Sequence, residues 1–207
     1  MTTANVLTDT RGVTAAADTT KARIERAALL LFCAHGVDAV TTREIAAASH
    51  VSEGALYRHY PSKEALAQTM FFAIHKKLAA EMQRAAADAP RIEDKARAIV
   101  AAYCRIADED WALFSYHLLT THRFLPYADK PAERRTQHDN PVAVVEAVVG
   151  DAMKAGDLPA GDASFKAAAA LGVVLQTALH KVYGRIDSAL SAREAELTRA
   201  VIAVLKS

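Results

Sequence analysis

The sequence contains few cysteines, few aromatic residues and no long hydrophobic run. Its two cysteines, Cys33 and Cys104, lie far apart and form no CxxC pattern, which argues against a metal-binding knuckle or a redox pair. We interpret both as buried free thiols, which fits a reducing compartment. No stretch approaches the roughly 20 apolar residues of a membrane-spanning helix, and the N-terminus lacks the basic leader and apolar core of a signal peptide. We therefore expect a cytoplasmic protein with no membrane partner.

An excess of positive charge is also lacking. The 25 lysines and arginines are balanced by 24 aspartates and glutamates, which gives a net charge of +1. Many nucleic-acid-binding proteins are more basic, but DNA binding needs only a local patch of donors and cations. No nucleophile elbow, glycine-rich phosphate loop or HExxH motif occurs. An enzyme is therefore disfavoured, and we expect neither a cofactor nor a metal.

Hydrophobic residues make up 52% of the chain although aromatic residues make up only 6%. Alanine and leucine supply much of this fraction, and both favour helices. Apolar periodicity and capping residues predict an all-α fold of about nine helices, and residues 123–138 are predicted to be a loop. The Thr/Ala-rich residues 1–17 are interpreted as a disordered N-terminal arm. The predicted helices cover residues 20–35, 41–49, 52–58, 62–87, 90–107, 108–122, 141–155, 162–183 and 191–205.

Two of the predicted helices are short and are joined by a tight turn. Thr41 and Glu44 form a capping box at the start of the first, and Ser52 can cap the second. Helices of this length are marginal alone, so both must pack against the preceding helix. The second helix then presents its other face outward, and a helix of this width fits the DNA major groove. The residues placed to make the packing contacts are Ile45, Ala46, Val51 and Leu56.

The segments 41–46 and 51–66 resemble the N-terminal domain of the TetR family of bacterial transcriptional regulators, within about residues 20–67. The resemblance implies a homodimer in which three N-terminal helices bind a double-stranded DNA operator. It also implies a larger C-terminal helical domain that dimerises and binds a small-molecule effector. We therefore predict a helix-turn-helix DNA-binding domain at 18–65 and a ligand-binding and dimerisation domain at 66–207. The implied function is that of a ligand-responsive repressor, released from its operator by the effector.

The resemblance and the side-chain chemistry together predict the DNA-binding residues. Arg43 has the donors that suit a guanine edge, whereas Tyr57, Tyr60 and Lys63 suit phosphate oxygens. Which bases are contacted does not transfer from the family. The full predicted set is Thr41, Thr42, Arg43, Ser52, Glu53, Gly54, Ala55, Tyr57, His59, Tyr60 and Lys63.

Two features depart from a simple DNA-binding pattern. His50 occupies the turn position that is usually glycine in the family, so we expect a left-handed residue that histidine tolerates and glycine would adopt freely. In addition, the acidic and basic residues between Asp18 and Glu64 cancel formally. This balance keeps a second interpretation open, a helical interaction module without DNA binding.

The C-terminal part resembles the family mainly in its architecture, so no ligand transfers. A ligand pocket needs apolar walls and a few polar groups, and such residues gather on the middle helices and on helix 162–183. For each of them an ordinary core or surface position is the alternative. The predicted ligand-binding residues are Tyr103, Trp111, Phe114, His117, Gln176 and His180.

The resemblance implies that the last two predicted helices form a four-helix dimer interface, two helices from each chain. Small residues there would allow close approach of a second copy, although periodicity alone does not distinguish an interface from an intrachain core. On this hypothesis, ligand binding changes the separation of the two DNA-binding domains through the long helix 62–87. The predicted interface residues are Phe165, Ala168, Gly172, Leu175, Leu179, Leu197, Val201 and Val204.

Overall fold

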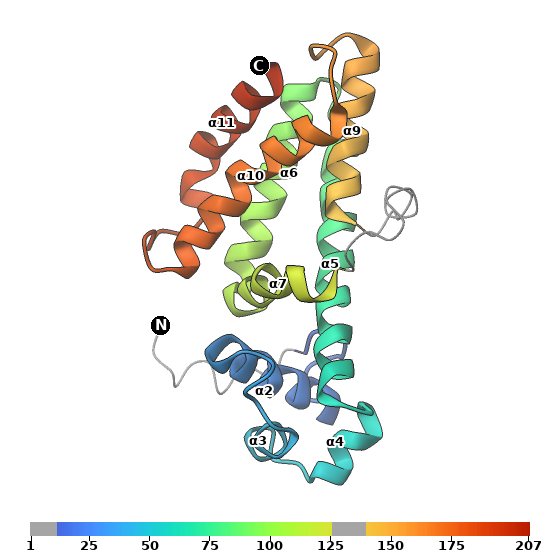
Figure 1. The fold of residues 1–207 in the computed structure, drawn as a ribbon, viewed down its shortest axis with the longest axis vertical. Helices are drawn as coiled ribbons and strands as arrows, with labels where there is room; N and C mark the ends of the chain where they lie inside the picture. Colours follow the sequence, from blue (N-terminus) through green and yellow to red (C-terminus); the bar gives the residue numbers. More distant parts are fainter. Residues whose placement is uncertain (1–11, 126–139) are drawn as a thin grey trace. The chain divides into compact units, whose positions relative to one another are not determined.

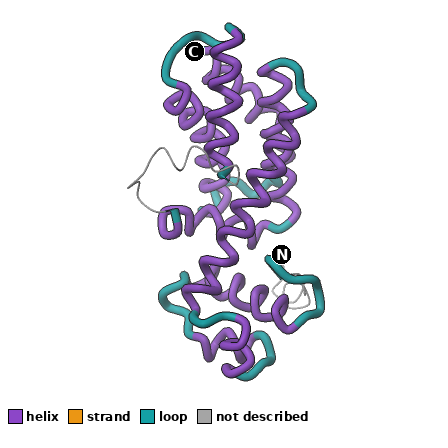
Figure 2. Tube along the Cα trace, turned by 90° about the vertical axis from the view of Figure 1, so that its right-hand side faces the viewer, coloured by secondary structure: helices purple, strands orange, loops and turns teal. Residues whose placement is uncertain are grey.

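The computed structural model describes residues 12–125 and 140–207, and all regular structure within these ranges is helical (Figures 1 and 2). The predicted all-α class is confirmed, as is the arrangement of an N-terminal helix-turn-helix followed by a larger helical region. Most of the predicted loop at 123–138 and most of the predicted disordered arm lie outside the described residues. Arg123 and Phe124, however, are helical and not part of a loop, and Val13 and Thr14 of the predicted arm are held by hydrogen bonds to Glu25. The helices are α2 (Thr20–His35), α3 (Thr42–Ala48), α4 (Glu53–His59), α5 (Lys63–Ala87), α6 (Ile92–Glu109), α7 (Trp111–Phe124), α9 (Pro141–Ala155), α10 (Ala163–Val182), the 3-10 turn η1 (Ser191–Arg193) and α11 (Glu194–Lys206).

Contacts between residues divide the chain into two compact units. Among the described residues, unit 1 contains 12–74 and 112–125, and unit 2 contains 75–111 and 140–207. The long helix α5 contributes its first half to unit 1 and its second half to unit 2. The predicted domain boundary at residue 65 remains a proposal.

Unit 1 is built around α2. This helix begins where the Thr19 side chain accepts a hydrogen bond from the Ala22 amide, and it ends at Gly36, whose φ of 78° favours glycine. Tyr116 of α7 joins this core, because its ring stacks on Phe32 and its hydroxyl donates to the Ala67 carbonyl at 2.7 Å. The buried core side chains include Ile24, Leu29, Phe32, Ile45, Leu56, Leu66, Met70, Phe71 and Tyr116.

Unit 2 is a helical layer in which α10 packs against α9 and α11, and α11 also packs against α6. Asn140 and Asp162 cap α9 and α10 through their side-chain oxygens. The carboxylate of Asp108 accepts hydrogen bonds from the amides of Leu190 and Ser191, both at 2.9 Å, and so ties the end of α6 to the start of η1. No helix within residues 12–125 and 140–207 has the combined length and apolarity that crossing a bilayer requires.

Candidate nucleic-acid interface

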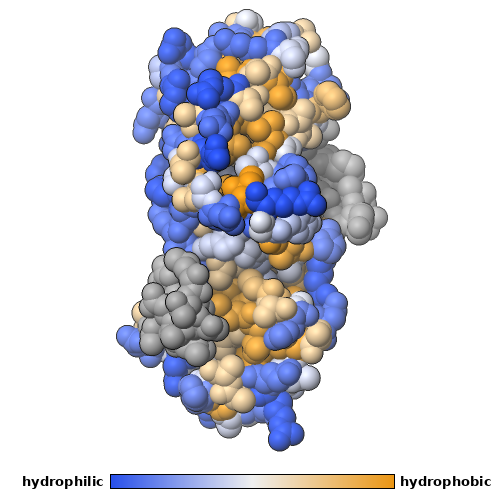
Figure 3. Space-filling view, turned by 90° about the vertical axis from the view of Figure 1, so that its left-hand side faces the viewer, coloured by the Kyte–Doolittle hydropathy of each residue, from blue (hydrophilic) through white to orange (hydrophobic). Residues whose placement is uncertain are grey.

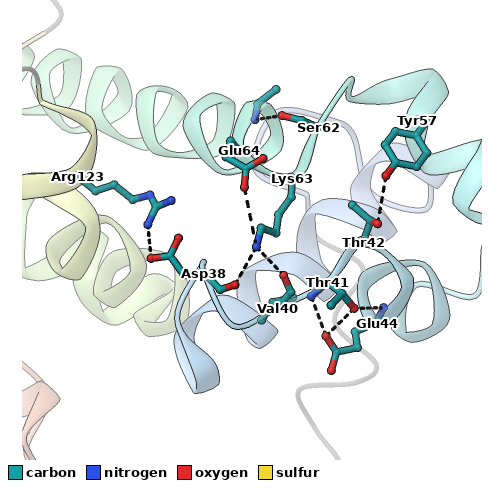
Figure 4. Close-up of polar contacts among 11 residues, drawn as sticks. Asp38, Val40, Thr41, Thr42, Glu44, Tyr57, Ser62, Lys63, Glu64 and Arg123 are labelled. Carbon is teal, nitrogen blue, oxygen red and sulfur yellow. Dashed lines mark hydrogen bonds and ion pairs between the residues drawn. The ribbon is translucent and has the colours of Figure 1, made fainter.

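The helix-turn-helix of unit 1 is formed by α3 and α4, and side-chain caps set where each helix begins; Figure 4 shows the cap of α3. The hydroxyl of Thr41 accepts a hydrogen bond from the Glu44 amide at 3.2 Å, while Glu44 Oε2 accepts one from the Thr41 amide at 2.7 Å. The predicted capping box is thus confirmed. The hydrogen bond from the Thr41 backbone also holds the pKa of Glu44 below its usual range. At α4, Ser52 Oγ accepts a hydrogen bond from the Ala55 amide at 3.1 Å.

The turn between the two helices passes through a left-handed residue. His50 has φ of 54°, so the expectation of a left-handed residue at this position is confirmed. The turn nevertheless pairs its backbone groups, because the His50 amide donates to the Ala47 carbonyl and the Val51 amide to the Ala46 carbonyl. The left-handed histidine therefore costs conformational energy at its own φ angle, but these backbone hydrogen bonds of the turn are kept.

The exposed face of α3 and α4 carries most of the predicted DNA-binding residues. Tyr57 is 49% exposed, and its hydroxyl lies 3.3 Å from Thr42 Oγ1 (Figure 4). Thr42 Oγ1 also donates to Glu53 Oε2 at 3.3 Å, so the two helices are linked at this face. Thr41, Arg43, Ser52, Glu53, Gly54, Tyr57 and His59 are exposed, and Thr42, Ala55 and Lys63 are half-buried. We call these residues, apart from Lys63 at the start of α5, the α3–α4 face.

Tyr60 lies in the core and not on this face. Its side chain is only 4% exposed, and its hydroxyl donates to Glu25 Oε1 at 2.5 Å. The predicted phosphate contact of Tyr60 does not agree with this placement, because the residue ends α4 and turns inward. Arg58, by contrast, is exposed beside Tyr57 but was not in the predicted set.

The ammonium group of Lys63 is turned toward the loop that precedes α3. It donates to the carbonyls of Asp38 at 3.1 Å and Val40 at 2.7 Å (Figure 4). In the same loop the Asp38 carboxylate accepts a hydrogen bond from Arg123 of α7 at 2.7 Å, and this bond holds the pKa of Asp38 below its usual range. Lys63 and Arg123 therefore hold the loop that leads into Thr41. The contact between Asp38 and Arg123 joins residues too distant in sequence for any local pattern to indicate it.

Unit 2 contains a narrow apolar cavity of about 40 Å³. Tyr103 is the only lining residue with a polar side chain. Of the predicted ligand-binding residues, Tyr103 lines this cavity, whereas Trp111, Gln176 and His180 do not. The lining residues are Met82, Ile92, Ala96, Ile99, Val100, Tyr103, Val145, Val148, Val149, Ala170, Leu171, Val174, Val201 and Leu205.

Two predicted ligand-binding residues belong to unit 1 and not to the unit that holds the cavity. Phe114 is buried there, and His117 stacks on Phe71 with their ring centres 4.9 Å apart. The predicted ligand-binding residues are therefore divided between the two units. No group of three or more His, Cys, Asp or Glu that could hold a metal occurs in the described ranges 12–125 and 140–207.

The predicted dimer residues separate into an exposed group on α10 and a mostly buried group on α11. Phe165 is 75% exposed and Leu175 is 37% exposed, and Ala168 and Gly172 are exposed on the same helical face. Figure 3, which faces the side of α10 and α11, shows hydrophobic residues gathered among hydrophilic ones in this region. Leu197 and Val201 are buried within the protomer, while Val204 and Leu179 are half-buried.

Residues 24–70 match the family model described as bacterial regulatory proteins of the tetR family. No curated protein sequence matched the chain. The matched segment contains α3, α4 and the turn between them, and therefore the whole α3–α4 face.

Solved structures share the fold over nearly the whole chain. A bacterial regulatory protein of the tetR family from Rhodococcus RHA1 is 22% identical, with a TM-score of 0.71 over 91% of this chain and 97% of that one. FadR from Bacillus subtilis, solved with stearoyl-CoA, is 14% identical, with a TM-score of 0.70 over 88% of this chain and 97% of that one. The fatty acid degradation regulator FadR from Bacillus halodurans is 15% identical, with a TM-score of 0.69 over 87% and 96%.

The left-handed conformation of His50 leads to a prediction about stability. We expect His50→Gly to leave the free energy of unfolding unchanged or to raise it by up to about 1 kcal/mol, because glycine adopts positive φ freely although it adds entropy to the unfolded chain. His50→Val should lower it by about 1 to 2 kcal/mol, because a β-branched residue is strained at positive φ. Urea unfolding measures both values. A His50→Val protein as stable as the native one would contradict the left-handed assignment.

Proposed function

We propose that the chain, whose residues 24–70 match the model of the tetR family of bacterial regulatory proteins, is a DNA-binding transcriptional regulator of that family and not an enzyme. Its residues carry out this function as follows. The α3–α4 face contacts operator DNA, α10 forms the core of a homodimer interface, and the cavity of unit 2 accepts the apolar part of a small effector. The observation that carries the proposal is the capped helix-turn-helix within the matched segment, with Arg43 and Tyr57 exposed on one face.

The chemistry of the α3–α4 face suits both bases and phosphates. The guanidinium of Arg43 offers two parallel donors, which match the acceptors of a guanine edge. The neighbouring hydroxyls of Thr42 and Tyr57 can donate to phosphate oxygens, which position a protein on the duplex. Gly54 has no side chain, and the nearest atom that a Cβ would meet is Ser52 Oγ at 3.9 Å. The backbone of α4 can therefore approach the groove closely.

The balanced charge of the N-terminal part is compatible with DNA binding, because several of its acidic groups are engaged internally. Glu25 is buried, Glu44 caps α3, and Asp38 is paired with Arg123. These carboxylates are directed toward protein donors, whereas Arg43 and Arg58 remain exposed. Within the α3–α4 face the one acidic residue is Glu53, whose Oε2 accepts a hydrogen bond from Thr42, so the face is compatible with DNA contact despite the formal charge balance of the whole segment.

The exposed face of α10 supports a homodimer. Phe165, Ala168, Gly172, Leu175 and Leu179 recur at helical spacing on one side of the helix. An exposed phenylalanine and leucine beside small residues is the pattern of a helix that another helix covers closely. We assign Leu197 and Val201 to the protomer core, so α11 would contribute its half-buried Val204 and not these two. A two-fold dimer would present two α3–α4 faces to a symmetric operator.

The lining of the cavity favours an effector with an apolar chain. Thirteen of its fourteen lining residues have no polar side-chain atom, and Tyr103 supplies the one hydroxyl. In the FadR structure from Bacillus subtilis the bound molecule is stearoyl-CoA, and we infer an effector with an acyl chain of this kind. A cavity of about 40 Å³ has space for only a few waters, so such a chain must widen it. For the regulator to respond to its effector, the effector must bind the state with the widened cavity more tightly than the state with the narrow one.

DNA binding is tested by selecting a binding sequence from a random duplex library with the native protein and measuring its affinity by fluorescence anisotropy. The double variant Arg43→Ala, Tyr57→Ala should bind the selected duplex at least about 30-fold more weakly, because each contact contributes roughly 1 to 3 kcal/mol. Arg185→Ala, an exposed arginine of unit 2, is the matched control and should bind normally. Affinity should fall steeply with salt. A flat salt response would exclude phosphate contacts.

The dimer proposal predicts that a charge on α10 separates the protomers. We expect Phe165→Glu to sediment as a folded monomer, because a carboxylate at the centre of an apolar interface is desolvated without a partner. Val142→Glu is the control, since Val142 of α9 is also an exposed apolar residue, at 38%. Sedimentation equilibrium distinguishes the two states. An unchanged dimer in Phe165→Glu would place the interface elsewhere.

The effector proposal predicts chain-length-dependent binding. Stearoyl-CoA should raise the thermal unfolding midpoint, short-chain acyl-CoA should raise it less, and CoA alone should leave it unchanged. Val149→Phe fills the cavity with a larger side chain, and we expect at least about tenfold weaker stearoyl-CoA binding by calorimetry. Val142→Phe, on the outer surface of α9, should bind as the native protein does. Equal binding of CoA with and without the chain would refute the assignment.

A further inference from the structure

The buried carboxylate of Glu25 is a feature of unit 1 that the contacts proposed above do not use. Glu25 lies on α2 and is 0% exposed. Its Oε2 accepts hydrogen bonds from the amides of Val13 at 2.6 Å and Thr14 at 2.8 Å. Its Oε1 accepts hydrogen bonds from the hydroxyls of Thr14 and Tyr60. Lys21 is the nearest cation, at 4.0 Å, so the charge is stabilised mainly by four converging donors.

Gly12, Val13 and Thr14 form what we call the N-terminal strap. A Cβ on Gly12 would lie 2.8 Å from the Cα of Ala22, 2.9 Å from the Ala22 Cβ and 2.8 Å from Glu25 Oε2. The first of these is a backbone atom of α2 that cannot move aside, so only glycine allows the strap to approach this closely. Val13 adds an apolar contact with the core of unit 1. The close approach at Gly12 and the hydrogen bonds of Glu25 are independent observations of the same docked segment.

The same carboxylate also holds the end of α4. Tyr60 is the C-terminal cap of this helix, and its amide donates to the Leu56 carbonyl at 3.0 Å. Burial and the hydrogen bond to Glu25 raise the pKa of Tyr60 well above its usual range, so its hydroxyl remains a donor. His59, directly before Tyr60, belongs to the α3–α4 face. One side chain of α2 thus contacts both the strap and the residue that ends the proposed DNA-contacting helix.

We propose that Glu25 is a positioning residue for α4 and that the N-terminal strap is a working part of the DNA-binding unit. The docked strap supplies three of the four donors that hold the Glu25 carboxylate, and the carboxylate in turn holds Tyr60 and the end of α4. If the strap leaves, three donors are lost and water enters to hydrate the charge, so the carboxylate no longer meets the Tyr60 hydroxyl in one fixed geometry. The positioning is independent of DNA, but its consequence for DNA affinity rests on the proposed function of the α3–α4 face.

The test compares Gly12→Val, which cannot dock the strap against Ala22, with Tyr60→Phe, which removes the hydroxyl that meets Glu25. Hydrogen exchange without DNA should be about tenfold faster at the α4 amides in each variant, and unchanged in α9 and α10. Exchange in the first half of α5 should change less than in α4, which distinguishes positioning from a general loss of stability in unit 1. Affinity for the duplex selected by the native protein should fall about tenfold.

Gly161→Val is the matched control, because a Cβ at Gly161 would meet only Met153 Cε, at 3.8 Å. It should leave α4 exchange and DNA affinity unchanged. Thr14→Val removes one hydroxyl donor but keeps the backbone of the strap, and it should give a smaller acceleration in the same helix. This milder variant provides the measurement if Gly12→Val does not fold.

The double variant Gly12→Val, Tyr60→Phe decides between coupling and independent support. If the strap acts through Glu25 on Tyr60, α4 exchange in the double variant matches that of the single variants. If the two accelerations multiply, or if Gly12→Val leaves α4 exchange unchanged, the proposal is overturned. Faster α4 exchange with unchanged DNA affinity would support positioning by Glu25 and would instead contradict the proposed DNA contact of α4.

Discussion

Two helices of seven residues each cannot persist alone in water, because a helix this short makes too few backbone hydrogen bonds to offset the cost of its first turn. Much of the structure of unit 1 follows from this constraint. Thr41 and Ser52 cap the two helices, and Ile45 and Leu56 anchor them in the core without measurable exposure. The N-terminal strap and Glu25 then hold the far end of α4. The position of the exposed face of α3 and α4 therefore depends on the contacts that the opposite, buried side of these helices makes with the core.

Several charged side chains of unit 1 also help to hold these short helices and the loop before them in place. Glu25 and Glu44 accept hydrogen bonds from backbone amides, and Asp38 accepts one from the side chain of Arg123, so all three carboxylates already have protein donors. Lys63 and Arg123 are likewise engaged with the loop that contains Asp38. A formally neutral segment can therefore present a face with exposed arginines, because its negative groups are directed inward or toward protein donors.

The local features of this fold could be predicted from the sequence, and the long-range ones could not. The capping box at Thr41 depends on neighbours within a few residues, the left-handed His50 was expected from the glycine that the family usually has there, and the burial of Leu56 was expected from its apolar spacing. Tyr60 was placed on the wrong side because its partner, Glu25, lies 35 residues away and looks like an ordinary charged position on a helix. Periodicity can place a tyrosine at the end of a helix, but it cannot show that its hydroxyl donates a hydrogen bond to a buried carboxylate far away in the sequence.

The same limit applies to the candidate ligand and dimer residues. His117 and Tyr103 are both aromatic and polar, but one stacks on Phe71 in unit 1 and the other lines the cavity of unit 2. On α11, Leu197 and Val201 are buried within the protomer, where this helix packs against α6 and α10. On α10 the buried stripe of Ala170 and Val174 is distinct from the face that exposes Phe165. From sequence periodicity alone, the two apolar faces of one helix cannot be told apart. Packing in three dimensions shows which face is buried and which is exposed.

The cavity and the α3–α4 face belong to different units. Coupling between them can use the helices that run continuously from one unit into the other. The chain provides two covalent connections. Met82 lines the cavity from α5, and the first half of the same helix carries Lys63, which holds the loop before Thr41. Tyr103 lines it from α6, and α7 follows after Asp110 and carries Arg123, which holds the same loop. Both routes end at the loop between α2 and α3. Under the proposed function, an apolar chain that widens the cavity by moving α5 or α6 would displace elements that continue into the two side chains that hold the loop before α3, and this is the route we propose for the coupling.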